Sequence, residues 1–292
     1  MKKILKFLSL LLPLLVALGS IFAVQIAAIL VYYSVYFTAG FYLLFTGKYN
    51  INIDTLVDYM PFPSMDFLTN LGMISPLVWI IIFYLWYKSI RKKDTVVRVK
   101  VFTWRSIIML VLVSLGFQLL INGLMELILP FFEELAQDYN ELMEQLNYAN
   151  PLLTLLSVVI LAPLSEELIF RGVILSKATK FTTFTVANVL QALFFGFFHM
   201  NIVQGLYAFL GGLAMGYIAH QYRTIKASIL FHFFFNGISY VMLAPISLLM
   251  KIAYVIVGAV IIYFALKHIK RTVEEETTRV QISQDQSVNT PE

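Results

Sequence analysis

Cysteine is absent from the 292-residue sequence, and charged residues make up only 13% of it. The lack of cysteine excludes a disulfide framework, a thiolate zinc site and a cysteine nucleophile. An average soluble domain has about 25% charged residues, so the low charge is also unusual. No basic tract is interleaved with aromatic residues, as a nucleic-acid groove requires, and we therefore expect no nucleic-acid partner.

Apolar residues are correspondingly abundant, at 60% of the chain, with a mean hydropathy of +0.81. A soluble core of this size needs far less apolar surface, so the lipid bilayer is the expected solvent. The runs predict an all-α, polytopic integral membrane bundle of about eight transmembrane helices. The expected spans are roughly 8–35, 67–87, 106–130, 152–175, 183–200, 203–221, 227–246 and 252–267.

The distribution of basic residues predicts the orientation. With a cytoplasmic N-terminus, each inner loop is rich in lysine and arginine, as in the segment 88–105, whereas the outer loops contain only Lys48 and Lys251. This is the positive-inside pattern. We expect both termini in the cytoplasm and a location in a bacterial plasma membrane.

Four segments are expected along the chain. Residues 1–150 hold N-terminal transmembrane helices, the basic inner loop and an acidic outer segment, 131–150, whose apolar positions predict an amphipathic surface helix. Residues 151–247 form the functional core and 248–272 the last transmembrane helix. Residues 273–292 are polar, which predicts a disordered tail. Within the core, Gly212 and Gly216 predict close helix packing.

Ionisable residues interrupt the fourth span at Glu166, Glu167 and Arg171. One charge at the centre of a span costs about 2.5–3.5 kcal/mol on insertion scales. Glu167 and Arg171 are four residues apart and can pair, whereas Glu166 points about 100° away. The cluster is therefore either a functional carboxylate beside an ion pair, or an ion pair that merely joins two helices.

Two of the four histidines, His199 and His232, lie inside phenylalanine-rich runs, and Asn236 follows His232 by four residues on the same helix face. Polar groups on an apolar helix need partners from another helix, which an interhelical hydrogen bond would supply. Together with Glu166 they also resemble an assembled site. Straight spans would place the four residues at different depths, with His232 near the inner end of its span, so we expect tilted, broken or longer helices.

Two chemistries fit this set of residues. A glutamate with histidine can activate a water molecule, while histidine and an asparagine amide donate hydrogen bonds to the oxyanion of peptide hydrolysis. Alternatively, Glu166, His199 and His232 could hold zinc with one position left for water. The sequence contains no His-Glu-x-x-His motif, no Gly-x-Ser-x-Gly motif and no pair of aspartates within a span.

The order of three short motifs resembles the CPBP family of CAAX prenyl proteases and bacteriocin-processing or bacteriocin-immunity proteins. The resemblance covers about residues 150–245, which in the family form a core of four helices. The motifs are Glu166-Glu167-x-x-x-Arg171, Phe195-x-x-x-His199 and His232-x-x-x-Asn236.

The resemblance implies a role for each residue. Glu166 would activate water with help from His199, and His232 with Asn236 would stabilise the oxyanion. The supporting residues would be the ion pair and a neighbouring aromatic ring, which are Glu167, Arg171 and Phe195. No cofactor is the favoured expectation, because an amide is a poor zinc ligand and a good oxyanion donor, although zinc is the alternative.

The resulting hypothesis is an intramembrane endopeptidase of the CPBP type. Its expected partners are the lipid bilayer and a membrane-embedded or membrane-docked peptide or protein substrate. The alternative is a non-catalytic membrane regulator, bacteriocin-immunity factor or scaffold that uses the same fold. A transporter also uses buried carboxylates and histidines, but the spans show no inverted repeat.

Overall fold

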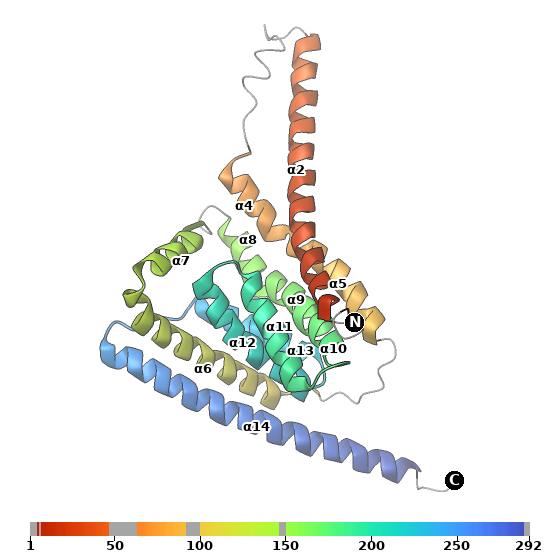
Figure 1. Cartoon of the computed structure of the whole chain (residues 1–292), viewed down its shortest axis with the longest axis vertical. Coiled ribbons are helices and arrows are strands. Elements are labelled where there is room, and N and C mark those ends of the chain that lie inside the picture. Colours follow the sequence, from red (N-terminus) through yellow and green to blue (C-terminus); the bar gives the residue numbers. More distant parts are fainter. Residues whose placement is uncertain (1–4, 6, 47–62, 92–99, 146–149, 289–292) are drawn as a thin grey trace.

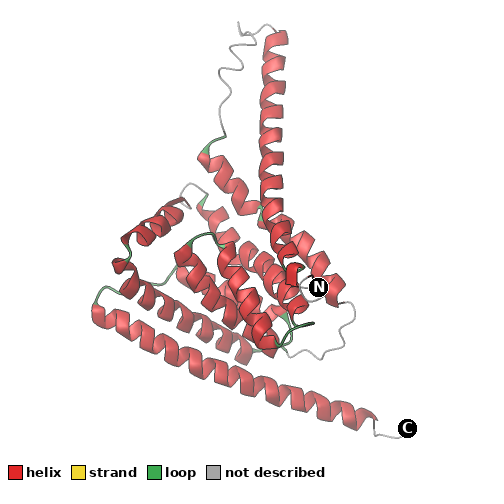
Figure 2. Cartoon of the chain, in the orientation of Figure 1, coloured by secondary structure: helices red, strands yellow, loops and turns green. Residues whose placement is uncertain are grey.

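The computed structural model describes residues 5, 7–46, 63–91, 100–145 and 150–288. Every regular element within these ranges is a helix (Figure 2), which confirms the expected all-α class. Several basic residues fall outside the described residues, namely Lys2, Lys3, Lys6 and those at 92–98, which are expected inside, and Lys48, which is expected outside.

Among the described residues before the core there are five helices and a short turn (Figure 1). They are α2 (Leu11–Thr46), α4 (Met65–Ile74), α5 (Pro76–Arg91), α6 (Trp104–Ile128), a 3-10 turn η1 (Leu129–Phe131) and α7 (Glu133–Gln145). α7 lies in the segment expected to form an amphipathic helix. Apolar residues recur along it at helical spacing, and three of them, Leu135, Tyr139 and Leu142, are half-buried.

The core begins with one continuous helical rod and continues with three separate helices. The rod comprises α8 (Pro151–Leu156), η3 (Ser157–Leu161), α9 (Ala162–Glu167), η4 (Leu168–Leu175) and α10 (Ser176–Ala178). The separate helices are α11 (Phe184–Phe198), α12 (Ile202–Gln221) and α13 (Ile225–Ser239), and α14 (Leu248–Val288) follows.

Two stretches of the rod, η3 and η4, are π-helical. Pro163 lies in the first turn of α9, just after η3. A proline has no backbone N–H, and its ring clashes with the carbonyl four residues earlier, so the wider π turn accommodates it without breaking the rod. The two carboxylates of the fourth span therefore lie on a short α-helical segment between two widened ones.

Six helices of the described chain are long and apolar enough to cross a membrane, fewer than the expected number of about eight. The difference arises because α11 and α13 have 15 residues each. Such a helix is about 22 Å long, shorter than a hydrocarbon core of roughly 30 Å. Both short helices are held by longer neighbours, because α11 packs against α12 and α13 packs against α6.

Close helix packing around α12 follows the prediction from its glycines. A Cβ atom on Gly196 of α11 would lie 2.7 Å from the carbonyl oxygen of Gly205, and one on Gly205 would lie 2.9 Å from that of Gly196. A Cβ atom on Gly212 would meet Ala192 at 3.1 Å, and one on Gly216 would overlap the Asn188 side chain. The backbones of α11 and α12 therefore approach as closely as small residues permit.

A second close contact joins α6 and α14. A Cβ atom on Gly258 would lie 2.6 Å from the carbonyl oxygen of Gly116, and one on Gly123 would lie 2.8 Å from that of Lys251. The Lys251 Nζ atom lies 3.1 Å from the Glu126 carboxylate, so the one lysine expected outside within the described ranges is paired. This seam fixes α14 along the outside of the core (Figure 1).

The predicted disordered tail is wrong for residues 273–288, because α14 continues to Val288. Charged side chains four residues apart support the polar part of this helix. Arg271 Nε lies 2.9 Å from Glu275 Oε1, and Lys270 Nζ lies 4.0 Å from Glu274 Oε1. Polar composition alone thus did not distinguish a solvated helix from an irregular tail.

Replacing Gly258 by Ala should lower the stability of the protein, because the new methyl group would press on backbone atoms of α6. Overpacking of this kind costs about 1–3 kcal/mol. Gly19 in α2 has nothing within 4 Å of an added Cβ, so Gly19→Ala is the matched control. Thermal unfolding in detergent should show a lower midpoint for Gly258→Ala alone; equal midpoints would contradict the close approach.

Candidate active site

An ion pair inside the rod is the most buried part of the site. The side chains of Glu167 and Arg171 are both fully inaccessible, and Arg171 Nη1 donates to Glu167 Oε1 at 2.7 Å. Arg171 Nη2 donates to the carbonyl oxygen of Gly212 on α12 at 3.1 Å, and the guanidinium lies 4.6 Å from the ring centre of Phe195 on α11. The pair therefore joins the rod to two other helices.

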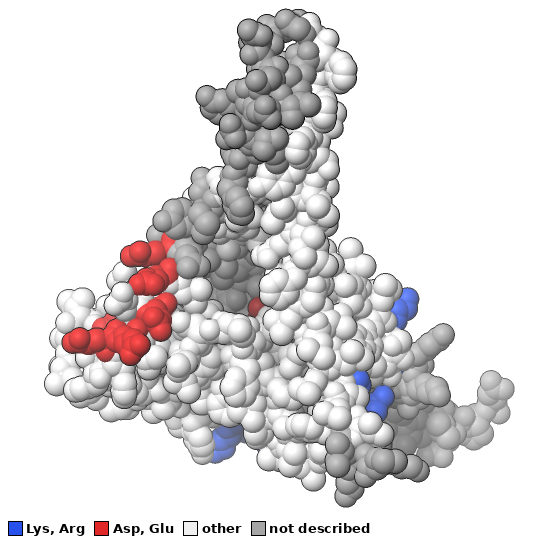
Figure 3. All heavy atoms as spheres, turned by 45° about the horizontal axis from the view of Figure 1, so that its top comes forward, with Lys and Arg blue, Asp and Glu red and all other residues white. Residues whose placement is uncertain are grey.

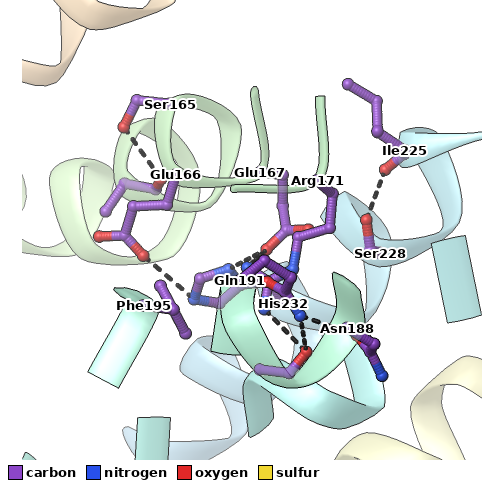
Figure 4. Close-up of polar contacts among 12 residues, drawn as sticks. Ser165, Glu166, Glu167, Arg171, Asn188, Gln191, Phe195, Ile225, Ser228 and His232 are labelled. Carbon is purple, nitrogen blue, oxygen red and sulfur yellow. Dashed lines mark hydrogen bonds and ion pairs between the residues drawn. The ribbon is translucent and has the colours of Figure 1, made fainter. Parts of the chain in front are cut away.

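His232 lies between the two carboxylates of the rod (Figure 4). Its Nδ1 atom is 3.1 Å from Glu167 Oε1, and its Nε2 atom is 3.7 Å from Glu166 Oε2. The Glu167 side chain is fully buried in its ion pair with Arg171, whereas 13% of the Glu166 side chain is exposed. Glu166 is thus the carboxylate that an incoming molecule can reach.

His199 is placed by its own helix end. It is the C-cap residue of α11, and its Nδ1 atom lies 2.8 Å from the carbonyl oxygen of Phe195. Because a carbonyl oxygen only accepts, Nδ1 must carry the proton in this contact, which leaves Nε2 as an acceptor in the neutral ring. The Phe195 ring stands edge-on to His199 at 4.8 Å and to His232 at 5.8 Å, so it separates and orients both imidazoles.

Asn236 is held by the first π-helical segment. Its Nδ2 atom donates to the carbonyl oxygen of Val158 in η3 at 2.8 Å. A carboxamide has two N–H groups, so one remains after this bond is made. The π turn thus positions the side chain that follows His232 by one helical turn.

These side chains line one chamber of about 850 Å³. Its walls include all four residues singled out in the sequence together with one supporting ring, which are Glu166, His199, His232, Asn236 and Phe195. A second hollow, of about 1150 Å³, lies at the basic ends of the helices and includes none of the four, although Arg171 contributes to its wall.

The expected mismatch in depth does not occur, because α13 begins at Ile225 and ends at Ser239. The helix therefore ends earlier than the expected span 227–246, and His232 lies at its middle rather than near its inner end. Glu166 lies close to the middle of the rod, Pro151–Ala178. Since α11 and α13 are both short, the end of α11 that carries His199 also reaches the chamber.

The zinc alternative can be compared with the positions of the possible ligands. In the described ranges, no group of three histidine, aspartate or glutamate side chains is arranged to hold a metal ion. The three proposed ligands Glu166, His199 and His232 share the chamber wall, and the contact of His199 Nδ1 with a backbone carbonyl leaves Nε2 as the nitrogen that would face a metal. The favoured expectation of a metal-free site remains a prediction.

Sequence reasoning overlooked a polar layer behind the ion pair. Gln191 Nε2 donates to the Gly212 carbonyl oxygen at 2.8 Å and to Asn188 Oδ1 at 2.8 Å, and Asn188 Nδ2 donates to the carbonyl oxygen of Leu213 at 3.0 Å. Gly212 thus accepts from both Arg171 and Gln191. The signal was present, because two amides three residues apart on an apolar helix require buried partners.

The core that carries these side chains also matches a known protein family. Residues 148–238 match the family described as type II CAAX prenyl endopeptidase Rce1-like. The matched stretch is thus similar to Rce1-like domains, which is consistent with the resemblance to the CPBP family of membrane proteases that the motifs predicted. No curated protein and no solved structure matches the chain significantly.

Replacing Arg171 by Met should destabilise the protein by about 3–5 kcal/mol, because Glu167 would be left as a buried charge without a cation. The double variant Glu167→Leu with Arg171→Met removes both charges and should recover part of that loss. Unfolding in detergent measures both effects. The exposed pair Lys270–Glu274 is the control, and Lys270→Ala should have no measurable effect. If Arg171→Met lowered the free energy of unfolding by much less than the expected loss, the central role of the ion pair would be contradicted.

Proposed function

We propose that the protein is an intramembrane endopeptidase that hydrolyses a peptide bond of a membrane-associated peptide or protein. The observation that carries the proposal is the division between two adjacent carboxylates. Glu167 is buried against Arg171 and His232, whereas Glu166 is accessible from the chamber and has His232 Nε2 at 3.7 Å. One carboxylate can organise the site while the other reacts.

In the proposed reaction Glu166 takes a proton from a water molecule as its oxygen attacks the carbonyl carbon of the substrate. His199 Nε2 accepts a hydrogen bond that helps to hold this water. The resulting oxyanion accepts hydrogen bonds from His232 and from the free N–H of Asn236. When the C–N bond breaks, the proton held by Glu166 passes to the leaving amine.

The charges of the site suit this reaction. Glu167 accepts from His232 Nδ1, which fixes the ring so that Nε2 points towards Glu166. To donate to an oxyanion, Nε2 must also carry a proton, which makes the ring a cation. Two carboxylates, Arg171 and this imidazolium together have no net charge, the least costly state for a group of charges in a low-dielectric region.

The side from which the substrate enters follows from the charges at the helix ends. The chamber wall includes Glu126 and Pro130 near the end of α6, and Tyr240 after α13. Acidic side chains gather over the nearby α7 (Figure 3). If the basic ends face the cytoplasm, as the positive-inside rule requires, the chamber opens towards the outer face. The substrate would then be a segment presented from the outer half of a bacterial plasma membrane.

Replacing Glu166 by Gln should abolish processing, because the amide cannot accept the proton of water. Loss of a general base typically lowers the rate by about 10²–10⁴-fold. Comparative peptidomics of membranes with wild-type protein and with Glu166→Gln should reveal peptides that require the carboxylate. Glu134→Gln, on the exposed face of α7, is the matched control. Identical peptide sets for Glu166→Gln and wild type would favour the non-catalytic regulator instead.

The purified enzyme should keep its activity after treatment with a metal chelator, since the proposed base, oxyanion donors and proton carrier are all side chains of this chain. The measurement is the rate of cleavage of a peptide identified in the comparison above, with and without chelator. Loss of activity on chelation, followed by recovery on addition of zinc, would instead support the zinc site at Glu166, His199 and His232.

A further inference from the structure

The chamber has a wall that the Rce1-like domain does not provide. The four proposed catalytic residues lie within residues 148–238, the matched stretch. The wall facing them comes partly from α6 and α7, which precede it. The contributions of α7 are uncharged, namely Ala136, Tyr139, Asn140, Leu142 and Met143.

The polar character of α7 is confined to its other face. Its five acidic residues are all exposed and absent from the chamber wall, namely Glu133, Glu134, Asp138, Glu141 and Glu144. α7 is thus an amphipathic helix with one face on the chamber and the other in contact with water or headgroups. A helix of this kind can move away from the bundle without carrying a charge through an apolar region.

An aromatic contact joins α7 to α12 of the core. The ring of Tyr139 stands perpendicular to that of Tyr207 on α12, with 6.4 Å between ring centres. Tyr207 lines the chamber beside Gln204 and Ala208, and Glu166 lines the same chamber. The same tyrosine therefore contacts α7 and lines the chamber that holds Glu166.

The start of α7 suits a movable element. It follows η1, a single 3-10 turn that contains Pro130, so it is not a rigid continuation of α6. α7 packs against η1 and against α12 (Figure 1). The α6 end, by contrast, is tied to α14 through Glu126 and Lys251.

We propose that α7 is a substrate-selecting cover of the chamber, closed by the contact between Tyr139 and Tyr207. Tyr139, Leu142 and Met143 set the size of the side chains accepted next to the scissile bond. The uncharged inner face selects an extended peptide segment with uncharged side chains there. The selection part rests on the proposed peptidase function, whereas the cover itself does not.

The absence of cysteine from the chain allows a direct test of the cover that does not require catalysis. A single cysteine is introduced at Ala208, or separately at Gln204, in full-length protein in lipid nanodiscs. The rate of its reaction with a small charged methanethiosulfonate reagent is then measured. Adding Tyr139→Ala should raise this rate about two- to tenfold, the population shift expected from losing one aromatic pair.

The matched control is Asp138→Asn, which changes the neighbouring residue on the exposed face of α7 and should leave the labelling rate unchanged. Two cysteine positions guard against a local effect at either one. Equal labelling with and without Tyr139→Ala at both positions would overturn the cover, whatever the protein hydrolyses.

Selection is tested with a mixture of synthetic peptides of varied sequence, whose cleavage products are read by mass spectrometry. Tyr139→Ala and Met143→Ala should shift the preference beside the cleaved bond towards larger side chains, and Asp138→Asn should keep the wild-type profile. An unchanged profile in the two wall variants would overturn the selecting role. Faster labelling without any cleavage by wild-type protein would instead refute the peptidase and leave the cover standing.

Discussion

The fully buried ion pair between Glu167 and Arg171 is the interaction on which the site depends. Each charge alone would be expensive in this environment, so both must be compensated by neighbours. The compensation comes from the Gly212 carbonyl of α12, the Phe195 ring of α11 and the His232 imidazole of α13. These partners lie on three different helices. The contacts that stabilise the two buried charges therefore also hold α11, α12 and α13 in position around the rod. The glycines of α12 allow its close approach to α11, the helix that carries Phe195.

The adjacent carboxylates illustrate how one helix can supply both a fully buried and an accessible carboxylate. Successive residues on a helix point about 100° apart, so Glu167 turns into the bundle while Glu166 turns towards the chamber. The shared neighbour is His232, which contacts one with each ring nitrogen. The histidine is therefore oriented by a buried anion and presented to an accessible one. Such an arrangement lets the environment, rather than the residue type, assign the roles.

Much of the site could be predicted from the sequence because ionisable residues in apolar runs need partners, and only a few such residues exist. Glu166, Glu167, Arg171, His199, His232 and Asn236 were found in this way, and the structure places them around one chamber or directly behind it. Helix limits were harder, since hydropathy does not show that α13 ends at Ser239 or that the rod contains π turns. The helix at residues 273–288 was missed because its polar composition was given more weight than the charge pairs four residues apart at its start, and the contact between Tyr139 and Tyr207 joins residues far apart in the sequence, which no local pattern reveals.

The π-helical segment η3 has a consequence for which changes in length the rod can tolerate. A π turn holds one more residue than the α turn it replaces, so it acts as a spacer between the start of α8 and the two glutamates. Loss of one residue between Pro151 and Ala162 would tighten that turn and rotate everything after it relative to α8. Alternatively it would pull Val158 away from Asn236. The direction in which the two glutamate side chains point therefore depends on the number of residues between Pro151 and Ala162 as well as on the identity of those residues.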